Sequence, residues 1–439
     1  MAEFFTIETK NLRFADGEMF FADGTSEIIE YDAEQPELKF EAYKGENIIG
    51  IILPESVKTI KFGAFNGCRN LKSLTISKNV EEIEDSAFFT CKKLAEITVS
   101  EKNKHYKTID GALFTYDGSE LLLYPAGKTE EEYTVPYGVT AICGSAFDGH
   151  AELTTVNIPE SVTSIGSGAF SDCRNLKNIT IPKGLVSLGG GAFENCASLV
   201  NIALPWGVSA IYDSTFRECT SLRSITITRN VTVIKDRAFF GCSRLESINI
   251  EKDDGALEIT PHKDEMKEND DKFSKYKEGF LGSKTSIGWY AFSGCHSLTT
   301  VTIPDGAYSI GRNAFSGCNN LKNVIIPKSV NYIGEDIFEN CKNLENIYYK
   351  GSMLRWAFVK KPRISPEEIK VGEYEYRSKS ANVYCQYSDS KFYKFISWFC
   401  KDRLHQPIFS LIQNILIAVL IVNSIYLVGS ILMYILFGA

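Results

Sequence analysis

Apolar and polar residues follow one another in this chain in an order that returns every 23 residues. One copy of the pattern is Val301-Thr-Ile-Pro-Asp-Gly-Ala-Tyr-Ser-Ile-Gly-Arg-Asn-Ala-Phe-Ser-Gly-Cys-Asn-Asn-Leu321, and others stand at 156–176, 179–199 and 202–222. A fixed period of this length is typical of a solenoid, in which each repeat forms one coil and buries its apolar residues against its neighbours. The periodicity therefore predicts the fold class before any local signal does.

Each copy divides into two short extended segments and a turn. Leu-x-x-Val-x-Ile places apolar side chains on one face of the first segment. A proline then ends that segment because it has no N–H for a strand ladder. Ser-Val-x-x-Ile-Gly forms the second segment, and an Ala-Phe pair closes the turn with the ring directed inward. Coils stacked about 4.8 Å apart would bury these side chains against each other.

The phenylalanine is the most regular position of the repeat. A cysteine follows it after three residues in most copies, and a leucine three residues after that. Successive phenylalanines lie 23 residues apart except across 88–147 and 239–292. They are Phe65, Phe88, Phe147, Phe170, Phe193, Phe216, Phe239, Phe292, Phe315 and Phe338.

The full pattern, Ile-Pro-x-Ser-Val-x-x-Ile-Gly-x-x-Ala-Phe-x-x-Cys-x-x-Leu, resembles the BspA-type leucine-rich repeat of the treponemal or bacterial class. The resemblance covers about residues 45–350. It implies a mainly β, right-handed, curved leucine-rich-repeat solenoid of 23-residue coils. It also implies a role in protein recognition, often as a surface adhesin.

The remaining segments predict caps and insertions. Residues 1–44 contain Asp-Gly turns between alternating apolar and charged residues, which predicts a β-rich N-terminal cap. Residues 101–135 show a hairpin pattern inserted in the solenoid. Residues 251–284 are highly charged, and we expect either a solvated loop or a binding element. Residues 351–388 depart from the repeat and resemble the family's C-terminal cap.

The composition limits the possible functions. The net charge is −8 with both signs mixed, so the chain lacks the basic character of a nucleic-acid-binding protein. The five histidines are scattered, and no nucleophile, phosphate-binding or zinc motif accompanies them. We therefore expect no enzyme activity, no cofactor, no metal and no small-molecule substrate.

Most of the twelve cysteines belong to the repeat. The regular spacing favours buried thiols that pack as small apolar side chains, although disulfides between coils remain an alternative. Cys143, Cys385 and Cys400 fall outside this column, and His150 takes the cysteine position in one further repeat. The column consists of Cys68, Cys91, Cys173, Cys196, Cys219, Cys242, Cys295, Cys318 and Cys341.

The C-terminal segment has a different character. Residues 415–437 carry no charge, and at 1.5 Å per residue they extend about 34 Å, enough for a bilayer core of about 30 Å. We expect a transmembrane helix within 408–437 and an amphipathic juxtamembrane segment at 389–406. Lysine and arginine precede the span, and the first ten residues do not resemble a signal peptide. This predicts a single-pass, tail-anchored membrane protein with a cytoplasmic repeat domain.

Three functions fit these features. The first is a membrane-anchored scaffold that binds a partner protein through the solenoid surface. The second is an extracellular cell-surface adhesin whose export route is not visible. The third is a redox sensor that uses the cysteine column. Free cysteines fit the reducing compartment of the first hypothesis.

Three aromatic residues are the candidate partner-binding site. The residue after the repeated proline is charged in most coils, which marks that corner as solvated, but it is Tyr137 in one coil and Trp206 in another. Tyr212 lies in the same coil as Trp206, where neighbouring coils have glycine. Exposed Trp and Tyr dominate many interfaces. Packing against the hairpin or a neighbouring coil is the alternative role.

Overall fold

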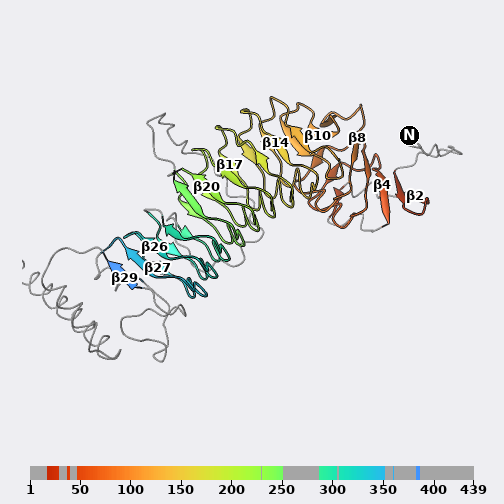
Figure 1. Ribbon diagram of the computed structural model, residues 1–439. Helices are drawn as coiled ribbons and strands as arrows, with labels where there is room; N and C mark the ends of the chain where they lie inside the picture. The colour runs from red at the N-terminus through yellow and green to blue at the C-terminus, as the bar shows by residue number, and fades with distance from the viewer. Residues whose placement is uncertain are drawn as a thin grey trace, which may run out of the picture.

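The computed structural model is a solenoid built from β-strands and turns (Figure 1). It describes residues 17–28, 37–39, 47–228, 230–250, 286–303, 306–351, 359 and 382–385. No helix occurs among these residues, and thus none that is long and apolar enough to cross a membrane. The predicted charged insertion, juxtamembrane segment and transmembrane helix lie outside the described residues.

One strand of each coil is two to five residues long and pairs in parallel with its counterparts in neighbouring coils. The register is the repeat length, because Ser224 pairs with Ser247 and Ile225 with Ile248. These strands are β4 (Ile48–Ile52), β6 (Ser73–Ile76), β8 (Glu96–Val99), β12 (Glu132–Thr134), β14 (Thr155–Asn157), β16 (Asn178–Ile179), β18 (Asn201–Ala203), β20 (Ser224–Ile227), β22 (Ser247–Ile250), β24 (Thr300–Thr302), β26 (Asn323–Ile326) and β28 (Asn346–Tyr349).

A second set of two-residue strands follows the proline corner, as the sequence pattern predicts. Ile234 pairs directly with Ile287, so the coils on either side of the longer interval 239–292 stack as neighbours. The set comprises β3 (Glu37–Leu38), β5 (Thr59–Ile60), β7 (Glu82–Ile83), β13 (Ala141–Ile142), β15 (Ser164–Ile165), β17 (Ser187–Leu188), β19 (Ala210–Ile211), β21 (Val233–Ile234), β23 (Ser286–Ile287), β25 (Ser309–Ile310) and β27 (Tyr332–Ile333).

The phenylalanine column forms the centre of the core. From Phe147 to Phe338 the rings stack with centroids 4.8 to 5.9 Å apart. All ten phenylalanines of the column are buried. The spacing of the rings follows the spacing of paired strands, so one set of contacts repeats along the axis. The prediction of a solenoid with coils of about 23 residues is confirmed.

A hairpin unit occupies the first longer interval. Strands β9 (Tyr106–Ile109), β10 (Ala112–Thr115) and β11 (Glu120–Leu123) pair antiparallel, and β11 then joins β13 in parallel. Alternate side chains of this unit enter two different cores. Leu113 and Leu123 pack with the N-terminal coils, whereas Phe114 and Leu121 pack with the C-terminal coils. The unit therefore joins two hydrophobic cores.

Each end of the described stack carries an added strand. At the N-terminal end, β1 (Glu18–Phe21) pairs antiparallel with both β4 and β2 (Ser26–Ile28). At the other end, β29 (Asn382–Cys385) pairs in parallel with β28. These strands continue the sheets beyond the repeat. The boundaries of the two caps, 1–44 and 351–388, stay predictions from the sequence.

Two residues of every coil adopt a left-handed backbone conformation, which the sequence pattern did not predict. They lie two residues before and two residues after the phenylalanine. The positions before it are Gly63, Ser86, Ser145, Gly168, Gly191, Ser214, Arg237, Tyr290, Asn313 and Asp336. The positions after it are Gly67, Thr90, Gly149, Asp172, Asn195, Glu218, Gly241, Gly294, Gly317 and Asn340. Gly, Asn, Asp and Ser predominate, as expected for this conformation.

Candidate partner-binding surface

The cysteine column has a structural role in the described coils. Each thiol from Cys91 onward donates a hydrogen bond to the carbonyl of the phenylalanine in the preceding coil. The Sγ–O distance is 3.1 Å from Cys196 to Phe170 and 3.0 Å from Cys341 to Phe315. The Phe170 carbonyl also accepts the backbone N–H of Cys173 at 3.2 Å, so the thiol is its second donor and links the two coils.

The same burial lowers the reactivity of these thiols. Loss of solvation raises the pKa of Cys196 and Cys242 well above the ordinary value, so both remain protonated. The nine cysteines of the column and Cys143 are free thiols. A hydrogen-bonded, protonated and inaccessible thiol is a poor nucleophile, so the geometry favours packing over the redox-sensor hypothesis.

His150 takes the place of cysteine in the coil that follows the hairpin unit. The residue 23 positions earlier is Gly127, which has no side chain, and the imidazole stacks on Tyr124 with centroids 5.1 Å apart. Its Nδ1 accepts a hydrogen bond from the Leu153 N–H at 3.3 Å, while its buried Nε2 has no partner in the described chain. Burial lowers the pKa of His150 to about 4. The neutral ring therefore serves as a core residue.

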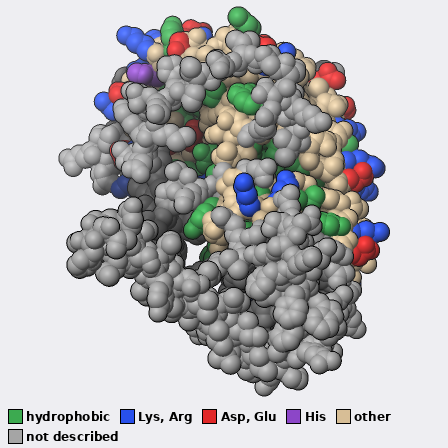
Figure 2. Space-filling view, turned by 90° about the vertical axis from the view of Figure 1, so that its left-hand side faces the viewer, with side chains coloured by type: hydrophobic (Ala, Val, Ile, Leu, Met, Phe, Trp, Pro, Cys, Tyr) green, Lys and Arg blue, Asp and Glu red, His purple; other side chains and the backbone are tan. Residues whose placement is uncertain are grey.

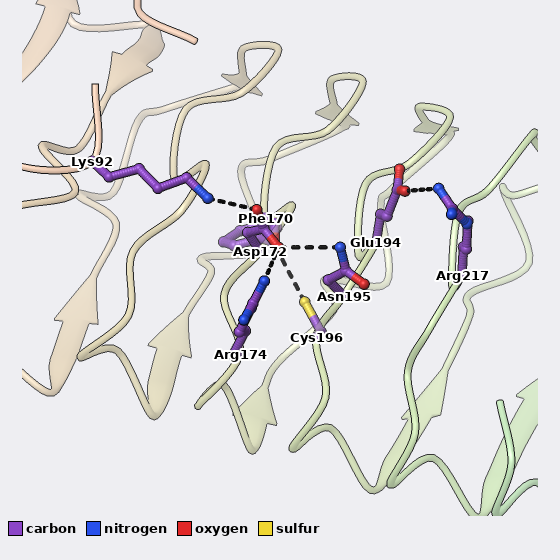
Figure 3. A network of polar contacts seen from close by, with 8 residues as sticks. All are labelled: Lys92, Phe170, Asp172, Arg174, Glu194, Asn195, Cys196 and Arg217. Carbon is purple, nitrogen blue, oxygen red and sulfur yellow. Dashed lines mark hydrogen bonds and ion pairs between the residues drawn. The ribbon is translucent and has the colours of Figure 1, made fainter. Parts of the chain in front are cut away.

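Polar contacts also run from coil to coil (Figure 3). Lys92 Nζ reaches across the intervening coil to Asp172 Oδ2 at 2.6 Å, passing Gly149, where a side chain would obstruct it. Asn195 donates to the same carboxylate at 3.1 Å. Burial by itself would raise the pKa of Asp172. The hydrogen bond and positive charge of Lys92 have the larger effect, so the pKa of Asp172 lies below its ordinary value. This network connects coils and offers no catalytic arrangement.

The remaining polar groups of the described coils do not gather into a metal site. Among the described residues, no group of three His, Cys, Asp or Glu side chains is placed to hold a metal ion. Figure 2 shows acidic and basic side chains intermixed along the rim of the visible face. The solenoid therefore presents a surface of mixed charge on which exposed aromatic residues are the most distinctive features.

The outward side chains of the first strands form a row of small polar residues. Within this row, Ser224 donates to Asn201 at 2.7 Å and Asn346 donates to Asn323 at 2.9 Å. Such ladders satisfy their own hydrogen-bonding groups between adjacent coils. They are also what β-propensity favours, so the row gives no specific indication of a ligand.

Trp206 lies at the corner after β18 and exposes 41 % of its surface. Its backbone is fixed, because its carbonyl accepts a hydrogen bond from Asn230 Nδ2 at 2.8 Å. The adjacent Gly207 lies so close to the Leu185 carbonyl that a side chain there would clash. A rigid corner therefore presents a partly exposed indole.

Tyr137 occupies the same corner of an earlier coil and is 89 % exposed. The next residue, Gly138, has φ of 99° and donates its N–H to Ser161 Oγ at 3.2 Å. The backbone at this corner is thus anchored to the following coil, while the phenol ring extends into solvent.

Tyr212 differs from the other two candidates because its ring is engaged by a neighbouring coil. It follows β19 directly and is half-buried. Lys235 Nζ lies 5.0 Å from the ring centroid, a cation–π distance. This contact supports the alternative role of Tyr212 as a packing residue.

The three candidates do not form one continuous patch. Tyr137 and Trp206 are three coil steps apart, each step about 5 Å, and Glu160 and Lys183 occupy the corners between them. Glu160 accepts a hydrogen bond from the Lys183 N–H at 2.9 Å. A partner that touches both aromatic residues must therefore extend along the solenoid axis.

Several further exposed aromatic residues were not among the candidates, and two of them occupy the same position of the coil. Phe62 and Trp289 lie three residues before the column phenylalanine and expose 54 % and 56 % of their surfaces. Most other coils have Gly, Ser, Asp, Arg or Glu at this position. The departure from that column could have identified both residues in the sequence.

Solved structures of other proteins are similar to parts of this chain. A leucine-rich repeat protein from Eubacterium ventriosum is 23 % identical with a TM-score of 0.48, covering 66 % of this chain and 63 % of its own. The chain thus spans less than two thirds of that protein. A leucine-rich cell surface protein from Faecalibacterium prausnitzii is 22 % identical with a TM-score of 0.39, covering 82 % of this chain and 99 % of its own. The pneumococcal vaccine antigen PcpA is 17 % identical with a TM-score of 0.42, and the match covers 77 % of this chain and 68 % of PcpA.

The family assignment rests on the repeat itself. Among proteins with curated descriptions, none matches this sequence. The family model for the BspA-type leucine-rich repeat region matches in six copies over residues 36–121, 140–258 and 280–358. These ranges contain all the phenylalanines of the column and cover well over half of the chain. The chain therefore belongs to the BspA-type leucine-rich repeat family.

Proposed function

We propose that this protein is a membrane-anchored scaffold that binds a partner protein through the surface of its solenoid and catalyses no reaction. The observation that carries the proposal is the exposure of Trp206 and Tyr137 on corners whose backbones are held by neighbouring coils. Aromatic residues on a rigid backbone contribute binding energy at a low entropic cost. A leucine-rich repeat scaffold is suited to this role because stacked coils offer an extended surface.

The membrane part of the proposal rests on the sequence. Residues 415–437 are uncharged and long enough to span a bilayer, and basic residues precede them. We propose a transmembrane helix within 408–437 that leaves the repeat domain on the cytoplasmic side. The buried, free thiols of the solenoid are compatible with a reducing compartment.

Quantitative affinity capture tests the binding surface. Full-length protein carrying Trp206→Ala or Tyr137→Ala is compared with Val186→Ala, which truncates another exposed apolar side chain, 61 % exposed. We expect the Trp206 change to lower recovery of a specific partner about tenfold or more, and Val186→Ala to leave it unchanged. Melting temperatures must match among the variants. Undiminished recovery by both aromatic variants would contradict a binding site at Trp206 and Tyr137.

Protease protection separates the scaffold from the adhesin. Intact cells that express the full chain are treated with an external protease, before and after selective permeabilisation of the plasma membrane. A cytoplasmic repeat domain resists digestion until permeabilisation. Digestion in intact cells would favour the extracellular adhesin and would contradict the proposed orientation.

A further inference from the structure

A second group of unusual surface residues lies on consecutive coils near the C-terminal end of the described stack. It consists of Arg237, Trp289, Tyr290 and Arg312, which we call the Trp289 patch. The backbone places these residues side by side, because the Arg237 N–H donates to the Trp289 carbonyl at 2.8 Å. The Tyr290 N–H donates likewise to the Arg312 carbonyl at 3.0 Å. The patch thus extends across three neighbouring coils.

Two of these residues have a strained backbone conformation. Arg237 and Tyr290 have φ of 55° and 57°, in a column where the other eight coils have Gly, Ser, Asn or Asp. A bulky side chain is strained in this conformation, and such strain is concentrated at functional sites. Thr90 and Glu218 are exceptions in the second left-handed column. Thr90 has a local explanation, since its hydroxyl accepts the Gly67 N–H at 3.1 Å.

The indole of Trp289 is held in place although it is 56 % exposed. The backbone N–H of Trp289 donates to Asp236 Oδ1 at 2.7 Å. The backbone N–H of Asp236 donates in turn to Asp213 Oδ1 at 3.0 Å. A side chain at Gly311 would lie 2.7 Å from Cδ1 of the indole, so the ring edge rests over that glycine. Trp289 is therefore an oriented aromatic anchor.

The charges beside the indole point to the chemistry of the partner. Arg237 is exposed, and its side chain makes no hydrogen bond or ion pair with the described residues. Arg312 makes two exposed contacts of 3.9 Å with Glu335 and Asp336, both longer than a hydrogen bond. Asp236, next to Arg237 in the chain, accepts the backbone N–H of Trp289. Both guanidinium groups therefore keep N–H groups that can donate hydrogen bonds to the carboxylate of a partner.

We propose that the Trp289 patch binds an acidic protein segment, which packs an apolar side chain on Trp289 and places carboxylates against Arg237 and Arg312. Trp, Tyr and Arg are the residue types that contribute most to protein interfaces, and a guanidinium binds a carboxylate in a defined geometry. The inference extends the proposed scaffold function to a second surface with a stated partner chemistry. It depends on protein recognition as such but is independent of the Trp206 corner.

Selection of peptides tests this proposal without a known partner. Random linear peptides of about twelve residues are displayed on phage and selected on the full-length protein, with counter-selection on its Trp289→Ala variant. We expect the peptides that depend on Trp289 to be enriched in Asp, Glu and one apolar residue. Absence of such peptides, or enrichment of basic or neutral ones, would overturn the proposal.

Variants of the patch separate binding from folding. For a selected synthetic peptide measured by fluorescence anisotropy, we expect Trp289→Ala to weaken binding about tenfold or more. Tyr290→Gly relieves the backbone strain, so it should raise the melting temperature. The same change should nevertheless lower the affinity for the peptide, because it removes the Tyr290 ring. Added salt should weaken binding to the wild type more than to Arg312→Gln. A purely structural role would change stability without changing peptide affinity.

Trp206→Ala is the matched control. It removes another partly exposed indole, and it should leave the affinity of the selected peptide unchanged. Equal loss in the Trp206 and Trp289 variants would show that the peptide recognises no particular surface, which would contradict the Trp289 patch. Loss confined to Trp289→Ala supports the patch even if the Trp206 corner binds nothing.

Discussion

From Cys91 onward, each column thiol donates a hydrogen bond to the preceding coil, which accounts for cysteine at this position. The Cys196 side chain is fully buried and its Sγ lies 3.1 Å from the Phe170 carbonyl. Alanine would leave a small cavity and remove one of the two donors to the Phe170 carbonyl, since the Cys173 N–H still donates to it. We therefore expect Cys196→Ala to lower the free energy of unfolding by about 1–3 kcal/mol in chemical denaturation.

Cys143 provides the control for this change. It lies outside the column and is only partly buried, so Cys143→Ala should cost less than Cys196→Ala. Equal effects, or a loss of a thiol-dependent response at normal stability, would contradict the structural role and favour redox sensing.

His150 makes the stability of the solenoid depend on pH. Burial lowers its pKa to about 4, below the value of about 6.5 for an exposed histidine. As the pH falls, the unfolded chain therefore takes up a proton at His150 at a higher pH than the folded chain does. The stability that the neutral His150 ring contributes is complete above pH 6.5 and is lost as the pH falls toward 4. We expect the loss to reach up to about 3 kcal/mol.

Asp148 acts in the opposite direction. Burial raises its pKa to about 6, so its protonated form is favoured by folding and stability from this group is lost as the pH rises from about 4 to 6. Denaturation of His150→Asn and Asp148→Asn across this range separates the two contributions. A slope unchanged by His150→Asn would contradict the buried neutral ring, and His105→Gln, at an exposed site, serves as control.

At the level of residues, periodicity predicted the buried columns but missed their exceptions. The Phe and Cys columns follow from spacing alone, because every coil repeats the same contact. Tyr124 takes a place in the phenylalanine stack, yet the hairpin pattern concealed it. The strained backbone of Tyr290 could not be inferred, because the left-handed position is apparent only from the conformation of all ten coils.

The close approach of two successive coils explains the glycine that follows β17. A side chain at Gly189 would lie 2.4 Å from the Ser167 nitrogen and 2.5 Å from the Gly166 carbonyl carbon, so the backbones would have to separate. We expect Gly189→Ala to lower the free energy of unfolding by about 2–4 kcal/mol in denaturant titration.

Gly184→Ala is the matched change at a spacious site. Its added methyl group would make only an ordinary contact, 3.6 Å from the Glu160 carbonyl oxygen. Stability should therefore stay within about 1 kcal/mol of the wild type, or rise because the unfolded chain loses freedom. If Gly189→Ala were equally harmless, the coils would be less tightly apposed than the structure indicates.

At the level of elements, the sequence predicted the strands and turns of the coil but not how interruptions are accommodated. The hairpin signal near Tyr116-Asp117-Gly118 corresponds to the antiparallel pair β10 and β11. The distribution of Leu113 and Phe114 into two cores is a tertiary property that strand alternation alone does not assign. The Tyr212 ring was a binding candidate by position, but its contact with Lys235 depends on the adjacent coil.

The solenoid as a whole should fold without the C-terminal apolar segment. Each coil contacts its neighbours, and a helix that faces lipid adds nothing to those contacts. We expect deletion of residues 405–439 to give a soluble protein with the β signal of the solenoid in circular dichroism. Immediate aggregation without a β signal would show that this segment belongs to the core.

We propose above all that the surface of the solenoid binds a partner protein. Hydrogen–deuterium exchange of the full-length protein, with and without its purified partner, tests it directly because it locates the contact. We expect slower exchange at the exposed corners near Tyr137 and Trp206, or around the Trp289 patch, with the Phe column equally protected in both states. Binding that leaves exchange unchanged throughout residues 47–250 and 286–351 would contradict it.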